Sequence, residues 1–201
     1  MNNINKNTGF LIKTALLSAI IIIMSFTPVG YLKVSVVEIS FIPVAVSIGA
    51  VFLGIKGGAL LGLVFGISSF LQCFGFSPFG TALFSINPFS TLILCIVPRI
   101  LMGALSGFAF HIIQKNAFGE NFACTAAGLA APVFNSIFFC SGLILLFGSS
   151  AFFTDDAKSN IIRYVVGLVW INSLVEAVVC TAISVAVILP LMRIVKRSEN
   201  R

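Results

Sequence analysis

The chain has 201 residues, of which 59% are hydrophobic and only 9% charged, and its mean hydropathy is +1.13. A soluble domain carries about 25% charged residues, so this composition excludes a surface that faces water on all sides and indicates one domain in a lipid bilayer. The net charge is +6, but the basic residues lie between apolar stretches. This pattern is typical of membrane proteins and argues against nucleic-acid binding.

Apolar stretches with the length of a transmembrane helix follow one another along the chain. The expected spans are 10–26, 39–53, 57–71, 88–113, 122–147 and 161–194. The first could be a signal peptide, but the residues that follow it (TPVGYLKV) offer no small-residue cleavage site, so we expect a retained helix. We therefore predict an all-α integral membrane protein in which residues 1–201 form a single domain of six transmembrane helices.

The basic residues predict the orientation of the chain. With the N-terminus inside, the inner side receives Lys6, Lys13, Lys56, Lys115, Arg193, Lys196, Arg197 and Arg201. The outer side receives Lys33, Lys158 and, depending on the helix boundary, Arg163, alongside Glu38, Asp155 and Asp156. Because cytoplasmic loops are enriched in Lys and Arg, both termini are expected to be cytoplasmic. The longer connections then lie outside, where we expect the functional face.

Arg99 stands in the middle of the fourth span. At a rise of about 1.5 Å per residue, it lies roughly 18 Å below Asn87, close to the bilayer midplane. An arginine at that depth costs about 2.5–3.5 kcal/mol, so it must face protein or water and have a partner. Pro98 precedes it, lacks an N–H, and leaves the Leu94 carbonyl without its helical donor. The helix can kink there and open space beside the charge.

Other polar side chains at membrane depth are candidates to join Arg99 around a polar ligand. They are Asn135 in the fifth span, Asn172 and Glu176 on one face of the sixth, and Gln72 and Asn87 near the outer ends of the third and fourth, with Phe134, Phe138 and Trp170 as expected walls. Simpler roles stay open. Arg99 and Glu176 could form an ion pair between two helices, the asparagines could form interhelical hydrogen bonds, and Gln72 and Asn87 could complete loop ends.

The sequence does not contain the residue patterns that several other functions require. The five cysteines show no CxxC or Cys/His spacing, so we expect neither a metal site nor a cofactor. The sequence contains no nucleophile–base pair that would suggest an enzyme, and it contains no P-loop motif of the kind that hydrolyses ATP.

Small residues four apart recur in three spans: Ala15/Ala19, Gly58/Gly62/Gly66 and Gly103/Gly107. Such strips allow close helix packing. Internal packing is the default interpretation, and Ala15/Ala19 is the best candidate for docking to a membrane partner.

The chain resembles an S component, the substrate-binding subunit of energy-coupling factor (ECF) vitamin transporters. The features that carry the resemblance are the short-looped spans, the Ala15/Ala19 strip, the basic turn at Lys56, and residues 42–72 followed by NPFSTLILCIVPRILMGALSG. The pattern is most similar to the pantothenate-type branch. The resemblance implies a multi-pass protein of the cell membrane that binds a vitamin from outside. It also implies partnership with a transmembrane coupling protein, which Ala15 and Ala19 would contact, and with two cytoplasmic ATPase subunits.

Pantothenate suits the candidate residues because a guanidinium pairs with a carboxylate in fork geometry, and asparagines suit hydroxyls and an amide. The expected substrate-binding residues are Arg99, Asn135, Asn172, Glu176, Gln72, Asn87 and Trp170. Two alternatives stay open: an S component for another vitamin such as riboflavin or folate, and a self-sufficient proton-coupled transporter of a small anionic solute with Glu176 as its protonation site.

Overall fold

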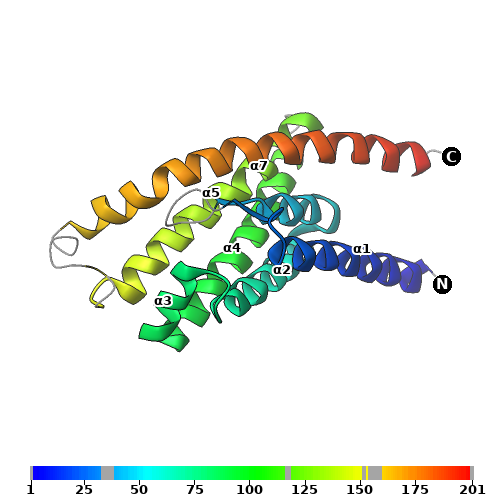
Figure 1. Cartoon of the computed structure of the whole chain (residues 1–201). Helices are drawn as coiled ribbons and strands as arrows, with labels where there is room; N and C mark the ends of the chain where they lie inside the picture. The colour runs from blue at the N-terminus through cyan, green and yellow to red at the C-terminus, as the bar shows by residue number, and fades with distance from the viewer. Residues whose placement is uncertain (1, 33–38, 116–118, 151–152, 154–159, 200–201) are drawn as a thin grey trace.

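The computed structural model describes residues 2–32, 39–115, 119–150, 153 and 160–199. Long helices pack side by side in an all-helical bundle (Figure 1). In chain order the elements are α1 (Asn2–Ser25), β1 (Tyr31–Leu32), β2 (Ile39–Ser40), α2 (Ile42–Gln72), α3 (Pro78–Ile86), α4 (Pro88–Lys115), α5 (Glu120–Phe147) and α7 (Ile161–Glu199). Several of these helices are long and apolar enough to cross a membrane, as the sequence predicts.

The second and third predicted spans lie within the single helical element α2. Gly54 breaks this element, with φ 72° and ψ −167°, a conformation that glycine adopts without the penalty of a side chain. Gly49 from the first half lies against a methyl group of Leu61 from the second half. In a straight helix these residues would be about 18 Å apart, so the two halves fold back on one another. By length and composition the described residues contain five candidate spans, with α2 counted once, and six crossings stay a prediction.

The glycine strips of α2 and α4 pack against each other. A Cβ atom on Gly58 would lie 2.2 Å from the Gly103 carbonyl oxygen, and one on Gly62 would lie 2.1 Å from the Arg99 carbonyl oxygen. Only glycine permits such an approach of two backbones. These strips therefore pack internally, and their contact determines where the backbone of Arg99 lies relative to α2.

Two segments that the sequence analysis treats as loop have regular structure. Residues 72–87 contain α3, which begins with Pro78 at its first turn and has Ser77 as N-cap, whose hydroxyl accepts from the Gly80 N–H at 3.4 Å. Near the first outer connection, β1 and β2 pair antiparallel, with Tyr31 opposite Ser40. The fold is thus almost entirely helical, with a short strand pair in addition.

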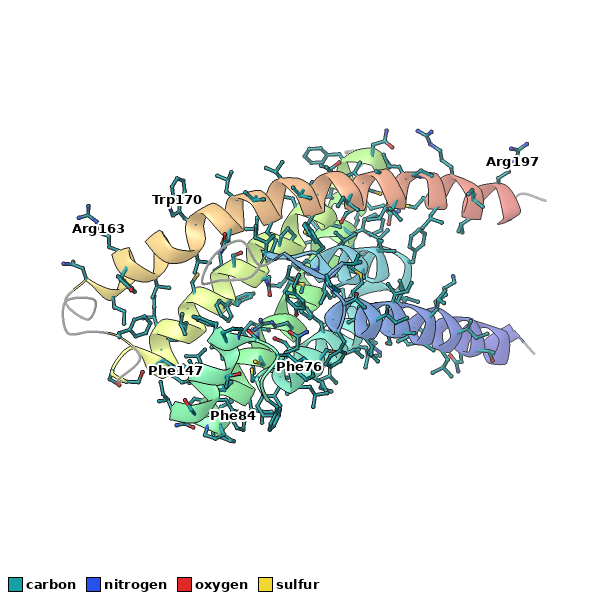
Figure 2. The ribbon with its side chains drawn as sticks, in the orientation of Figure 1. Phe76, Phe84, Phe147, Arg163, Trp170 and Arg197 are labelled. Atoms are coloured by element: carbon teal, nitrogen blue, oxygen red, sulfur yellow. The ribbon has the colours of Figure 1, made fainter. Side chains whose placement is uncertain are left out.

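The N-terminal end of α1 and the C-terminal end of α7 lie at the same end of the bundle, whereas α3 lies toward the other end (Figure 1). The exposed basic side chain of Arg197 lies at this end, close to the C-terminus (Figure 2). This arrangement is compatible with the predicted orientation but does not test it, because no membrane is present. Several residues used to predict the outer side, namely Lys33, Glu38, Asp155, Asp156 and Lys158, lie outside the described residues.

Candidate functional site

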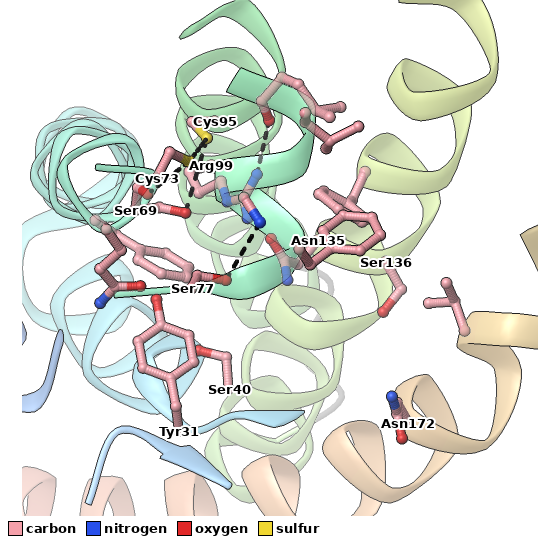
Figure 3. Close-up of a pocket in the computed structure, with 18 of the residues that line it drawn as sticks. Tyr31, Ser40, Ser69, Cys73, Ser77, Cys95, Arg99, Asn135, Ser136 and Asn172 are labelled. Atoms are coloured by element: carbon pink, nitrogen blue, oxygen red, sulfur yellow. Dashed lines mark hydrogen bonds between the residues drawn. The ribbon is translucent and has the colours of Figure 1, made fainter. Parts of the chain in front are cut away.

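A cavity of about 110 Å³ lies inside the bundle, where α2, α4, α5 and α7 meet. The strand pair contributes Tyr31 and Ser40 to its lining, and α3 contributes Gly80 and Leu83 (Figure 3). Of the expected substrate-binding residues, the cavity brings together Arg99, Asn135, Asn172, Glu176 and Gln72. Polar side chains far apart in the sequence therefore converge on one cavity.

Arg99 is 8% exposed, and its position follows from the proline before it. The Arg99 Nη1 donates to the Leu94 carbonyl oxygen at 2.7 Å. This is the carbonyl that Pro98 leaves without a helical donor, so the side chain replaces the missing N–H. The guanidinium carbon also lies 5.5 Å from the ring centre of Phe65 and 5.1 Å from that of Phe139. These two rings and one carbonyl hold the cation in place.

Arg99 and Glu176 do not form a direct ion pair, since no carboxylate oxygen of a described residue lies within 4.0 Å of the guanidinium. Instead, Glu176 Oε1 accepts from Asn135 Nδ2 at 3.4 Å. The Nε atom of Arg99 and the Oδ1 atom of Asn135 are buried and have no hydrogen-bond partner. A buried cation without a carboxylate in contact and an unpaired amide oxygen are both costly, which favours a ligand that supplies an anion and a donor.

Asn172 and Gln72 enter the cavity from other elements. Asn172 lies one helical turn before Glu176 on α7 and is 8% exposed. Gln72 ends α2, is 5% exposed, and its Nε2 donates to the Ser25 carbonyl oxygen at the end of α1. Gln72 thus completes a helix end, the simpler role considered for it from the sequence, and it also lines the cavity, whereas its contact with a ligand stays a prediction.

Two expected site residues lie outside this cavity. Asn87 is exposed and caps α4, because its Oδ1 accepts from the backbone N–H groups of Phe89 and Ser90, both at 3.1 Å. This is the loop-end role considered as its alternative. Trp170 is 55% exposed and points away from the bundle (Figure 2). It stands two residues before Asn172, about 200° around the helix, which is nearly the opposite face.

The aromatic walls also differ from those expected. Phe134 and Phe138 stack on each other, with ring centres 5.9 Å apart, and do not line the cavity. The aromatic side chains that line it are Phe65, Phe79, Phe139 and Tyr31. Phe139 follows Asn135 by four residues and shares its helical face. This spacing could have identified Phe139 as a wall of the cavity from the sequence.

Sequence reasoning also missed a pair of thiols in the cavity wall. The Cys73 and Cys95 sulfur atoms lie 3.8 Å apart, and both residues are buried and line the cavity (Figure 3). Cys95 precedes Arg99 by one helical turn, and Cys73 follows Gln72 directly. Their neighbours in the sequence could have indicated the location, but not that the two sulfurs meet.

Ala15 and Ala19 lie on α1, far along the helix from the cavity, and both are exposed. The described part of α1 packs mainly on α2 and leaves large apolar side chains uncovered, including Leu16 and Ile23, each 63% exposed. In a bilayer this surface meets lipid or another membrane protein.

The cavity combines one positive charge, several neutral hydrogen-bonding groups, one carboxyl group and aromatic walls. Such a set can bind and orient a small polar anion. Among the described residues, no group of three or more His, Cys, Asp or Glu side chains could hold a metal ion.

Comparison with known proteins bears on this site. The family described as "ECF transporter, substrate-specific component" matches residues 9–191. The pantothenate transporter PanT of Leuconostoc mesenteroides is 29% identical over 190 residues, which cover 87% of each chain. The pantothenic acid transporter PanT of Lactococcus lactis subsp. cremoris is 30% identical over 154 residues, which cover 71% of this chain and 72% of the relative.

The family resemblance inferred from residues 42–72 and the segment after them is thereby confirmed. Together with the apolar helices, the match identifies a multi-pass protein of the cell membrane that functions in transport and is not an enzyme. This chain belongs to the substrate-specific components of ECF transporters.

Proposed function

We propose that this protein captures pantothenate from outside the cell as the S component of an ECF importer. The observation that carries the proposal is the buried Arg99, which has no carboxylate partner and borders a cavity rich in neutral hydrogen-bonding groups. Pantothenate offers one carboxylate, an amide and two hydroxyls. The printed names of both relatives, as transporters of this vitamin, support the same ligand.

In the proposed complex, the pantothenate carboxylate accepts from the free Nε and the outer nitrogens of Arg99. Asn135 Oδ1, which has no hydrogen-bond partner among the described residues, accepts from a ligand hydroxyl or amide N–H. Asn172 and Gln72 contribute neutral polar groups. The aromatic faces of Phe65 and Phe139 keep the guanidinium oriented and exclude water from the pair.

The test is calorimetric titration of pantothenate into the purified protein and its Arg99→Gln and Arg99→Lys variants. Deleting one partner of a buried, charge-assisted pair costs about 2–5 kcal/mol, which is roughly thirty-fold or more in affinity. Lysine should restore little, because an ammonium lacks the planar fork. Trp170→Phe, outside the cavity, serves as control and should bind normally. Undiminished binding by a folded Arg99→Gln protein would show that Arg99 is structural.

The same titrations separate the alternatives. Riboflavin and folate should give no heat at concentrations that saturate with pantothenate. The solitary protein in proteoliposomes should not accumulate pantothenate under an imposed proton gradient. Accumulation without other subunits would instead indicate a proton-coupled carrier.

We further propose that α1 docks on the transmembrane coupling protein through Ala15 and Ala19, and that separate ATPase subunits drive transport. Support comes from their exposure, from the uncovered apolar surface around them, and from the family to which the chain belongs. Ala15→Leu or Ala19→Leu should abolish uptake with the full complex while pantothenate binding to the solitary subunit stays within about twofold. Leu145→Phe, on α5 and 83% exposed, is the control for an enlarged apolar side chain away from α1. Parallel loss of binding and uptake would show that the strip is internal packing.

A further inference from the structure

Glu176 is the cavity residue whose role the carboxylate–Arg99 pairing leaves unexplained. It is 6% exposed, and it projects from α7 into the same cavity as Arg99 without contacting the guanidinium. Its Oε1 accepts from Asn135 Nδ2 at 3.4 Å, which is long, and the backbone N–H of Ser40 also interacts with the carboxyl group. A carboxylate can accept about four hydrogen bonds, so this group retains capacity to accept from a ligand.

The charged and unpaired groups of the cavity come from different helices. Arg99, on α4, offers an unpaired donor at Nε, whereas Asn135 offers an unpaired acceptor at Oδ1 and holds Glu176 through its amide nitrogen. Among the described residues that line the cavity, Arg99 is the only base and Glu176 the only acid. A ligand that satisfies both regions has an anion at one end and neutral hydrogen-bond donors at the other.

We propose that Glu176 determines specificity by accepting from a neutral hydroxyl at the ligand end remote from the carboxylate and by excluding a second anion there. The inference rests on the proposed function and makes it more specific: the cavity takes pantothenate but rejects its phosphate ester at the terminal hydroxyl. The lining supplies one positive charge, and the ligand carboxylate uses it. Esterification with phosphate removes the hydroxyl proton that Glu176 would accept. Among the described lining residues the phosphate has no second cation to pair with, and it meets Glu176 and Asn135 Oδ1, which are both hydrogen-bond acceptors.

The test compares three ligands by calorimetric titration of the full chain in detergent: pantothenate, its phosphate ester at the terminal hydroxyl, and a neutral methanesulfonate ester at the same hydroxyl. The neutral ester has nearly the bulk of the phosphate but no charge. Like-charge juxtaposition costs several kcal/mol, so the phosphate ester should bind about a hundred-fold or more weakly than pantothenate.

Glu176→Gln preserves shape, removes the charge and adds a donor. In this variant the preference for pantothenate over the phosphate ester should shrink at least tenfold, whereas the preference over the methanesulfonate ester should stay within about threefold. Glu176→Asp retains the charge and should keep the rejection. Trp170→Phe, on the outward face of α7, is the control and should alter neither ratio.

Each outcome is decisive. If the wild-type protein binds the phosphate ester as tightly as pantothenate, the inference is overturned without any variant, and the proposed function stands. If Glu176→Gln leaves the phosphate discrimination unchanged, or reduces both ester penalties equally, size and not Glu176 excludes the phosphate, and the inference also fails. If the wild-type protein binds no pantothenate, the proposed function itself is wrong.

Discussion

Pro98 and Arg99 act as one structural unit, so removing the proline should raise stability and lower ligand affinity. In the wild-type helix the Leu94 carbonyl accepts from Arg99 Nη1 at 2.7 Å. In Pro98→Ala the new backbone N–H competes for that carbonyl. The guanidinium loses its hydrogen bond within α4 and becomes free to adopt other rotamers.

The two effects can be estimated separately. Proline in a helix interior is about 3 kcal/mol less favourable than alanine, and the Arg99 hydrogen bond offsets part of this, so we expect a net stabilisation of about 1–2 kcal/mol. A hydrogen bond from a charged donor contributes about 1.5–3 kcal/mol. Without this bond, the free energy of ligand binding must instead be used to hold the Arg99 guanidinium in one rotamer. The binding free energy for pantothenate should then fall by about 1–2 kcal/mol, or roughly five- to thirty-fold in affinity.

Thermal unfolding in detergent and calorimetric titration measure the two quantities on the same preparation. Pro190→Ala is the matched control, because Pro190 also lies inside a helix but does not line the cavity. It should raise the melting temperature without changing affinity. A Pro98→Ala protein that is more stable and still binds pantothenate within twofold of wild type would refute the idea that the Leu94 contact positions Arg99.

Two further predictions concern the walls of the cavity. Gly62→Ala would place a Cβ atom 2.1 Å from the Arg99 carbonyl oxygen, so it should lower the free energy of unfolding by about 1–3 kcal/mol and weaken pantothenate binding. The control Gly9→Ala, whose Cβ would have no atom within 4 Å, should do neither, and equal melting temperatures for the two variants would contradict the close α2–α4 packing. Bound pantothenate should slow the alkylation of Cys73 and Cys95 by a small maleimide, measured by mass spectrometry, but not that of Cys140, which lies outside the cavity. An equal effect on all three thiols would argue against ligand in this cavity.

Arg99 could be predicted from sequence because the bilayer leaves a charge few options. A cation at mid-depth must face protein, and the proline before it frees a known carbonyl. Asn172 and Glu176 followed from helical spacing alone, since residues four apart share a face. The same arithmetic argues against Trp170, which is two residues from Asn172, and applying it would have removed that residue from the site.

Other features depend on contacts between segments distant in sequence. The rotation of α5 about its axis decides whether Phe134 or Phe139 faces Arg99, and packing against α4, α7 and α2 determines that rotation. The 3.8 Å approach of Cys73 and Cys95 likewise joins two helices. By contrast, α3 had a local signal in Ser77 and Pro78, an N-cap followed by proline at the first turn, which hydropathy conceals because the whole connection is apolar.

The last prediction concerns which end of the bundle faces outward. The cavity is bordered by α3, and the ends of α1 and α7 that carry the termini lie at the opposite end (Figure 1). Because basic residues gather on the cytoplasmic side, Lys115 at the end of α4 should be inside and Ser85 on α3 outside. Both residues are exposed, so each can be replaced by cysteine, in a background without the native cysteines, and offered a membrane-impermeant maleimide.

In intact cells Ser85→Cys should react at once, and Lys115→Cys only after permeabilisation. This result would place the mouth of the cavity where pantothenate arrives. The reverse pattern would put the cavity on the cytoplasmic side of the resting protein, which is incompatible with capture from outside. Reaction of both positions in intact cells would mean that the two ends do not lie on opposite sides of the membrane, and the predicted count of crossings would then be wrong.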